Sequence, residues 1–158
     1  MRNGDPLVTV NILSYNRRDE LRNTLRRVFE QDYKNIEVIV VDNASSDGTC
    51  DMVENEFPAA SLIRLHKNVG IAGWNEGFRN ATGESILVLD DDSYPVHGTI
   101  RQALESINGD ADWGVLALDV YNMNWDKWET SMYRPENNLS FVGCGALVRK
   151  AIFPITGM

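Results

Sequence analysis

The chain alternates between short aliphatic runs and segments in which apolar residues recur every three or four positions. The aliphatic runs predict buried β-strands at residues 7–13, 36–42, 61–65, 85–89 and 113–118. The segments between them predict helices within residues 17–30, 50–57, 67–81 and 100–107. This order predicts an α/β fold in which helices cover both faces of a mainly parallel sheet.

Polar side chains follow the predicted strands at their carboxyl ends. They are Asn16, Asp42, Asn68 and three consecutive acids, Asp90, Asp91 and Asp92. Because right-handed crossovers bring the carboxyl ends of parallel strands to one edge of a sheet, we expect these side chains to lie close together. Ligands bind at this edge in sheets of this kind, so the pattern predicts a binding site there.

The three adjacent carboxylates of Asp90 to Asp92 need charge compensation. They repel one another and raise each other's pKa, so a divalent cation or a set of hydrogen-bond donors is expected beside them. A solvated acidic turn before Pro95 is the alternative, but the position after an aliphatic strand favours a cation site. Arg17, the arginine nearest the end of the first strand, is a candidate for binding phosphate. The other arginines of its helix indicate a solvated face.

Length and charge narrow the class of protein. A chain of 158 residues is expected to form one domain, and its 15 basic and 23 acidic residues, net charge -8, oppose binding to nucleic acid. Without a membrane-length apolar segment or the apolar core of a signal peptide, the sequence predicts a cytoplasmic protein. Cys50 and Cys144 are then expected to be reduced, and the isolated His66 and His97 lack metal-ligand spacing.

The segment from Tyr121 to Asn138 breaks the alternation and is rich in aromatic, amide and charged residues. One interpretation is a loop or an edge hairpin. The other is a surface on which Trp125 and Trp128 stack against sugars, while neighbouring amides and acids bond the sugar hydroxyl groups. After this segment, residues 141–150 predict a strand whose glycines allow close backbone approach.

Four segments of the chain, in order, resemble motifs of one enzyme family. They are Val10–Asn16, Val40–Thr49, Asn68–Gly70 with Asn75 and Gly77 after it, and Leu87–Asp92. Together they resemble the inverting family 2 glycosyltransferases of the GT-A fold, and residues 141–147 are similar to the acceptor-side strand of that family. The resemblance covers nearly the whole chain and implies a Rossmann-like, three-layer GT-A domain over residues 1–158. Residues 1–97 would form its nucleotide-sugar-binding half and residues 98–158 part of its acceptor half.

The resemblance also implies a set of site residues. It assigns binding of the nucleotide sugar, a UDP- or dTDP-sugar, to Ser14, Asn16, Asp42, Asn68, Gly70, Asp90 and Asp91. Asp42 would bond the imide of the pyrimidine base, with an Asx turn as its alternative role. Asp92 would be the direct ligand of Mg²⁺ or Mn²⁺. Asp90 would be the second residue of the metal site, through the ribose or a metal-bound water.

Transfer with inversion also requires a general base that deprotonates the acceptor hydroxyl. The resemblance puts this acid in a motif after the strand at 141–150, and no such motif occurs before Met158. Asp126 and Glu129 are acids in the acceptor region that no spacing assigns. We therefore expect a truncated catalytic domain whose acceptor, a saccharide, lipid or protein, is unidentified. Membrane association of a longer protein is compatible with this expectation.

Two other functions fit part of the pattern. An aliphatic strand followed by Asp-x-Asp also resembles the nucleophile strand of haloacid-dehalogenase-type phosphatases, with Asp90 as the nucleophile and Asp92 as the acid. Against this, the motif lies after three strand–helix units, and Ser93 to Pro95 fit that family's turn poorly. The other alternative is a nucleotide-sugar-binding fragment that does not catalyse a reaction.

Overall fold

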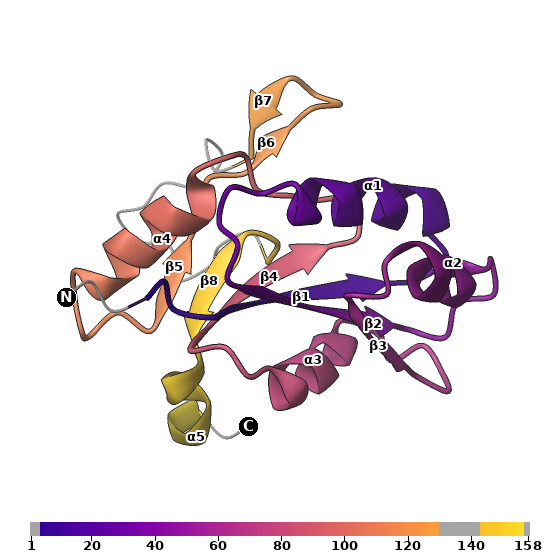
Figure 1. Cartoon of the computed structure of the whole chain (residues 1–158), viewed down its shortest axis with the longest axis horizontal. Coiled ribbons are helices and arrows are strands. Elements are labelled where there is room, and N and C mark those ends of the chain that lie inside the picture. Colours follow the sequence, from indigo (N-terminus) through magenta and orange to yellow (C-terminus); the bar gives the residue numbers. More distant parts are fainter. Residues whose placement is uncertain (1–3, 130–142, 157–158) are drawn as a thin grey trace.

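The computed structural model describes residues 4–129 and 143–156. Six strands form one sheet: β1 (Val8–Ser14), β2 (Ile36–Asp42), β3 (Ser61–Arg64), β4 (Ser85–Asp90), β5 (Val115–Ala117) and β8 (Ala146–Arg149). The helices are α1 (Arg18–Phe29), α2 (Thr49–Glu56), α3 (Trp74–Asn80), α4 (Thr99–Asn108) and α5 (Phe153–Thr156), with 3₁₀ turns η1 (Gly70–Gly73) and η3 (Lys150–Ile152). The short strands β6 (Tyr121–Asn122) and β7 (Lys127–Trp128) form a separate hairpin (Figure 1). Within the two described ranges, no helix has the length and apolar character needed to cross a bilayer.

The sheet is built around β1. Its strand order is β3-β2-β1-β4-β8-β5. β1 pairs in parallel with both β2 and β4, β2 pairs in parallel with β3, and β8 runs antiparallel to β4 and β5. The mainly parallel sheet that the sequence predicts is therefore confirmed.

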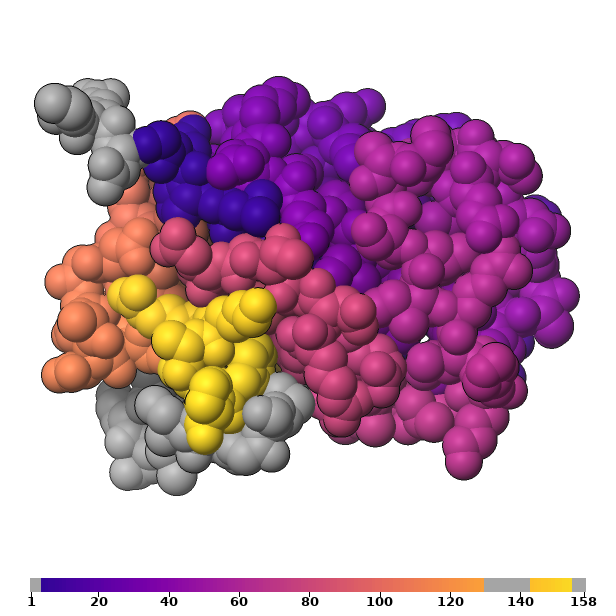
Figure 2. Space-filling model, turned by 60° about the horizontal axis from the view of Figure 1, so that its bottom comes forward, coloured from indigo at the N-terminus to yellow at the C-terminus, as the bar shows by residue number. Residues whose placement is uncertain are grey.

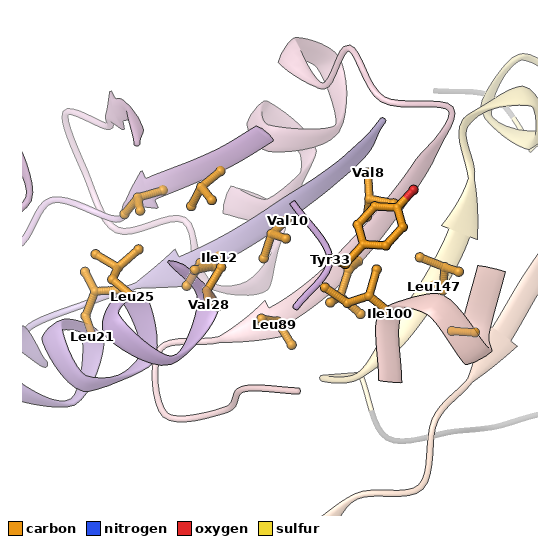
Figure 3. Close-up of a cluster of buried hydrophobic side chains, with 14 of the residues drawn as sticks. Val8, Val10, Ile12, Leu21, Leu25, Val28, Tyr33, Leu89, Ile100 and Leu147 are labelled. Atoms are coloured by element: carbon orange, nitrogen blue, oxygen red, sulfur yellow. The ribbon is translucent and has the colours of Figure 1, made fainter. Parts of the chain in front are cut away.

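Helices cover both faces of the sheet, which confirms the predicted three-layer architecture. On one face, α1, α2 and α4 bury a cluster that includes Val10, Ile12 and Leu25 (Figure 3). On the other face, α3 and α5 meet through Phe78 and Phe153, whose ring centroids are 5.0 Å apart. Figure 2 shows the C-terminal segment, in yellow, lying against the middle of the chain. Because β2 and β4 are buried on both faces, their central residues form continuous aliphatic runs. In β1, Thr9 and Asn11 interrupt the aliphatic run, although both are fully buried.

The later part of the chain departs from the expected boundaries. β8 begins only at Ala146, because Gly145 has φ = +77° and this left-handed conformation does not occur in a regular strand. The prediction of a strand from residue 141 is therefore wrong for Gly143 to Gly145, while residues 141 and 142 lie outside the described residues. Upstream of them, the hairpin of β6 and β7 confirms the hairpin interpretation of the aromatic segment for residues 121–129.

Gly77 allows α3 to pack tightly on β1. A Cβ atom at Gly77 would lie 1.9 Å from Oδ1 of Asn11, far inside any permitted contact. Asn11 is fully buried, and its amide donates a hydrogen bond of 3.1 Å to the carbonyl of Trp74, at the start of the same helix. The glycine therefore provides the space that the Asn11 side chain occupies between strand and helix.

We predict that Gly77→Ala lowers the free energy of unfolding by about 1–3 kcal/mol, because overpacking outweighs the gain of about 1 kcal/mol from higher helix propensity. Urea denaturation at pH 7 measures this change. The matched double variant Asn11→Ala/Gly77→Ala is expected to be less destabilised than the sum of its single variants, since the shorter side chain removes the clash. Strict additivity would show that the predicted contact does not determine the stability of this packing.

Glu37 connects β2 to β1 and to the turn before β4. Its carboxylate accepts hydrogen bonds from the Thr9 hydroxyl (2.5 Å) and from the backbone amide and hydroxyl of Thr82 (2.9 and 2.8 Å). Burial raises the pKa of Glu37, but these hydrogen bonds and the charge of Lys150 outweigh burial and lower it. The ionised form is therefore the one that the fold stabilises.

We predict that Glu37→Gln lowers the free energy of unfolding at pH 7 by about 1–2 kcal/mol, because the hydrogen bonds to a charged acceptor are lost or weakened. The folded-state pKa lies below the unfolded one, so this contribution is present above the unfolded pKa and disappears as the pH falls through the folded pKa. Denaturation curves from pH 7 down to pH 3 test the sign. A difference between the two proteins that grows on acidification would contradict the assignment.

Candidate functional site

The carboxyl ends of β1 and β4 form one wall of a pocket of about 270 Å³. Its lining consists of Leu13, Ser14, Tyr15, Arg17, Asn43, Asp90, Asp91 and Asp92. The chain continues from β1 to β2 and β3 on one side, whereas β4 lies on the other side of β1. The pocket therefore lies at the point where the strand order reverses, which is where sheets of this kind bind ligands.

A larger cavity of about 520 Å³ lies at the opposite edge of the sheet. Its basic side chains, Arg149 and Lys150, are directed at main-chain carbonyls: Arg149 donates to Trp113 (2.7 Å), and the Lys150 ammonium donates to Ala81 (2.6 Å). These cations are therefore engaged in holding the fold. The smaller pocket, where charged groups face open space, is the better candidate site.

The acidic triplet begins at the last residue of β4 and turns back toward β1. Asp91, the middle acid, is only 6% exposed and accepts a long hydrogen bond of 3.4 Å from the backbone amide of Tyr15. Its carbonyl accepts a hydrogen bond of 2.8 Å from the buried Thr24 hydroxyl on α1. Asp91 thus anchors the triplet on the β1–α1 connection, while Asp92 is about half exposed at the mouth.

The charges of the triplet are only partly compensated. The Arg17 guanidinium lies 2.9 Å from Oδ2 of Asp92 and 3.4 Å from Oδ1 of Asp91. Burial and the charge of Asp92 raise the pKa of Asp90, against the opposing effects of the Cys144 thiol and Arg17. Burial likewise raises the pKa of Asp91, although Ser14, Arg17 and the Tyr15 amide oppose the rise. A further positive charge in the pocket would therefore be favourable.

The donor set fits a hard cation that is only partly held by protein. Asp90 and Asp92 provide carboxylate oxygens beside one pocket, which suits Mg²⁺ or Mn²⁺. Among residues 4–129 and 143–156, no group of three or more acidic, histidine or cysteine side chains converges as a preformed cage. The residues therefore fit an ion bound through one or two carboxylates and completed by oxygens of a ligand such as a diphosphate.

Asp42 ends β2 just outside this pocket and is almost fully buried. Its Oδ2 accepts a hydrogen bond of 3.0 Å from the backbone amide of Ser45, which is the turn-forming role given as its alternative. Its Oδ1 is buried and has no hydrogen-bond partner. Burial raises the pKa of the neighbouring Cys50 thiol to about 11, with contributions from the hydrogen bond to Asp42 and from its charge. Asp42 thus keeps one acceptor atom that the turn does not use.

Asn43 holds the loop that contains Asn68 and Gly70. Its side-chain amide donates to Oδ1 of Asn68 (2.9 Å) and to the carbonyl of Gly70 (3.0 Å), and its Oδ1 accepts from the amide of Val69 (2.8 Å). Gly70 has φ = +61°, so it is needed for its backbone conformation, and space around it is open. Asn43 lines the pocket and bonds this loop, whereas Asn68 and Gly70 themselves are not among the lining residues.

The remaining predicted residues divide into two groups. Ser14 is buried and lines the pocket, as does Arg17, the phosphate candidate. Asn16 does not line it; with φ = +53°, it accepts a hydrogen bond of 2.8 Å from the Ser46 amide and so stabilises the facing turn. Asn16 therefore supports the pocket from outside, whatever role a ligand would give it.

Sequence reasoning missed three residues that the structure brings to this site. They are Tyr15, Asn43 and Cys144. Asn43 directly follows Asp42 inside a recognised motif, so that motif was the available signal. The Cys144 thiol, just before β8, interacts with Asp90 at the end of the neighbouring strand β4. Burial, together with the charges of Asp90 and Asp92, raises the pKa of this thiol to about 11. No local pattern connects residues so distant in the chain.

A contact links the hairpin of β6 and β7 to the segment that follows the acidic triplet. The Tyr94 hydroxyl, two residues after the triplet, lies 3.5 Å from the sulfur of Met123. Trp125 and Trp128 are 64% and 53% exposed, so their rings are accessible to a ligand. Their stacking on sugars stays a prediction. The two unassigned acids are engaged within the hairpin: Tyr121 donates a hydrogen bond to Asp126, and Asn122 donates to Glu129 (2.7 Å).

Solved structures share the fold described above. The mannosyltransferase PcManGT from Pyrobaculum calidifontis, in complex with GDP-Man and Mn²⁺, aligns with a TM-score of 0.76 at 26% identity, over 96% of this chain and 47% of that chain. Residues 1–349 of S. aureus TarS, in complex with UDP-GlcNAc, align with a TM-score of 0.78 at 24% identity, also over 96% and 47% of the two chains. The predicted GT-A fold is thereby confirmed.

Sequence comparisons identify relatives that are named glycosyltransferases. The Escherichia coli protein WfaP, named a UDP-Glc:alpha-D-GlcNAc-diphosphoundecaprenol beta-1,3-glucosyltransferase, is 36% identical over 91 residues, which is 56% of this chain and 36% of WfaP. The chain spans about a third of the length of several curated relatives that it matches. The family model of Glycosyl transferase family 2 matches residues 9–153, a range that includes every residue lining the pocket. The chain therefore belongs to glycosyl transferase family 2.

Proposed function

We propose that this chain forms the donor site of an enzyme that transfers a sugar from a nucleotide sugar to an acceptor hydroxyl, with inversion and with assistance from a divalent cation. One observation carries the proposal: Asp90, Asp91 and Asp92 line a pocket at the strand-order reversal together with Arg17, which contacts Asp91 and Asp92. An acidic group with one cation beside it suits a ligand that brings both a metal ion and a diphosphate. Membership of the family provides the reaction class.

In this proposal, Asp92 and Asp90 hold the cation and Asp91 fixes their loop against α1. When bound, the cation would neutralise charge on the departing nucleoside diphosphate. Arg17 adds a second positive charge beside the same leaving group. The general base is left unassigned: Asp126 and Glu129 each accept a hydrogen bond within their own hairpin, and neither lines the pocket.

Asp42 supports recognition of the base of the donor. Its Oδ1 is buried, so the turn around it would have to admit the base before this atom accepts a hydrogen bond from the imide N–H of uracil or thymine. The same chemistry would serve the ring N–H of guanine: WfaP is named for UDP-Glc, whereas PcManGT was solved in complex with GDP-Man. We propose a UDP- or dTDP-sugar as the donor, and the experiment below includes the guanine nucleotide as a competing ligand.

The acceptor side follows from one relative. The name of WfaP specifies an acceptor sugar linked by diphosphate to undecaprenol, a membrane lipid. We propose that the complete protein acts on a saccharide acceptor at the cytoplasmic side of a membrane. The phosphatase alternative is not retained, because the chain belongs to glycosyl transferase family 2 and shares the fold of a solved mannosyltransferase.

We predict that UDP, dTDP or GDP binds at least about tenfold more tightly with Mn²⁺ than without it, because the ion bridges Asp92 and the diphosphate. Isothermal titration calorimetry on the 158-residue chain measures both affinities. Asp92→Asn should remove most of the enhancement. Asp112→Asn, which also removes one exposed carboxylate but lies outside the pocket, should preserve it.

Equal binding with and without Mn²⁺ would contradict the metal-assisted donor site, provided that circular dichroism shows a folded protein. If Asp92→Asn keeps the full enhancement by Mn²⁺, Asp92 is not a ligand of the ion. The preference among the three nucleotides identifies the base. Tighter binding of UDP or dTDP supports the proposed donor, whereas binding of GDP alone would show that the site is specific for guanine.

A further inference from the structure

Arg17 occupies a special position in the candidate site. It directly precedes α1 and is the only basic residue among those that line the described pocket. Its guanidinium donates a hydrogen bond of 2.9 Å to Oδ2 of Asp92 and lies 3.4 Å from the buried Asp91. It thus supplies the compensating charge that three adjacent carboxylates require.

The other arginines of α1 have different partners. Arg18 pairs with Asp19, and Arg22 bonds both oxygens of Glu56 at 3.0 and 2.9 Å. Arg26 lies 3.9 Å from Glu56. Arg27 lies over the ring of Tyr94, 5.5 Å from its centroid. Arg17 therefore lines the pocket, whereas the four arginines of α1 itself have other partners.

The contact of Arg17 with Asp92 is incompatible with a cation on the same oxygen. A divalent ion ligated by Oδ2 would lie about 2 Å from it. A guanidinium 2.9 Å from that oxygen would then be only a few ångströms from a double positive charge, where repulsion is strong. One of the two cations must leave the oxygen.

We propose that Arg17 is an internal counter-cation of the acidic triplet that a divalent ion displaces from Asp92, and that the released guanidinium then binds the diphosphate of the donor. The inference rests on the proposed function for its second half, the diphosphate contact. Its first half concerns only Arg17, the two acids and a metal ion. Arg17 is 44% exposed, so it has room to move between the two positions.

This arrangement couples metal and nucleotide binding. A metal ion alone must break the contact between Arg17 and Asp92, which weakens its binding. A nucleoside diphosphate gives the displaced arginine a new anionic partner, so it recovers part of that cost. Each ligand therefore strengthens binding of the other, and the coupling is reciprocal.

Isothermal titration of Mn²⁺ alone tests the first half. We expect Arg17→Gln to bind Mn²⁺ about threefold to tenfold more tightly than the unaltered chain, in line with the modest strength of a half-exposed ion pair. Arg17→Lys keeps the positive charge and should bind Mn²⁺ nearly as the unaltered chain does. Arg26→Gln removes the same charge from the outer side of the same helix and should have little effect.

Titration of UDP or GDP with and without Mn²⁺ tests the second half. In Arg17→Gln the factor by which Mn²⁺ strengthens nucleotide binding should fall, while it stays unchanged in Arg26→Gln. Circular dichroism of each variant verifies that it is folded. Mn²⁺ binding that is tighter in Arg17→Gln, together with the smaller factor, supports the proposal.

Mn²⁺ binding that is unchanged or weaker in Arg17→Gln overturns the counter-cation, and so does an equal change in Arg26→Gln. An unchanged enhancement factor overturns the diphosphate contact. If no variant binds nucleotide, the proposed function fails together with the diphosphate contact. The nucleotide-free titration still decides whether Arg17 and the metal compete.

Discussion

The parallel pairing of β1 with β2 and β4 is the constraint on which the site depends. Its register places Ser14 opposite Asp42 and Leu13 opposite Asp90, so that the three strands end at the same edge. A shift by one residue would exchange the two faces of β1 and put the polar Thr9 and Asn11 where Val10 and Ile12 now pack. Burial of the aliphatic faces therefore fixes the position of the polar strand ends.

The same packing explains why the strand ends carry unusual charges. Asp91 is drawn against α1 by the Thr24 hydroxyl and the Tyr15 amide, which removes its carboxylate from solvent. Three ionised carboxylates in this partly buried position are unfavourable unless a cation accompanies them. Arg17 meets part of this need within the chain. In the proposed reaction, a metal ion and a diphosphate would meet the rest.

Much of the fold was predictable, because continuous aliphatic runs identify strands buried on both faces. The edge of the sheet that carries the polar residues followed from the same pattern, together with the handedness of crossovers. The start of β8 was not predictable from aliphatic content, since the left-handed φ of Gly145 ends the extended region. Boundaries of this kind depend on backbone conformations that glycine permits but does not require.

The site itself was predictable by residue type and less so by role. Asp90 to Asp92 and Ser14 lie where the strand ends indicate, and Arg17 joins them. Asn16 and Asp42 accept hydrogen bonds from backbone amides of turns. These local hydrogen bonds compete with contacts to a ligand, and residue type alone does not reveal which of them forms. The hydrogen bonds of Asn43 to the loop of Asn68 and Gly70, and the contact of Cys144 with Asp90, form only when distant segments pack together.

The central claim is that metal and nucleotide bind together at the carboxyl ends of β1 and β4. Paramagnetic broadening of backbone amide signals by Mn²⁺, with a nucleoside diphosphate present, tests it most directly by nuclear magnetic resonance. The account predicts that broadening is strongest at residues 14–17, 43 and 90–92. It should be weakest around Gly83 and Lys150, at the opposite edge roughly 20 Å away along the strands. Broadening centred on that opposite edge, or spread evenly over the surface, would contradict it.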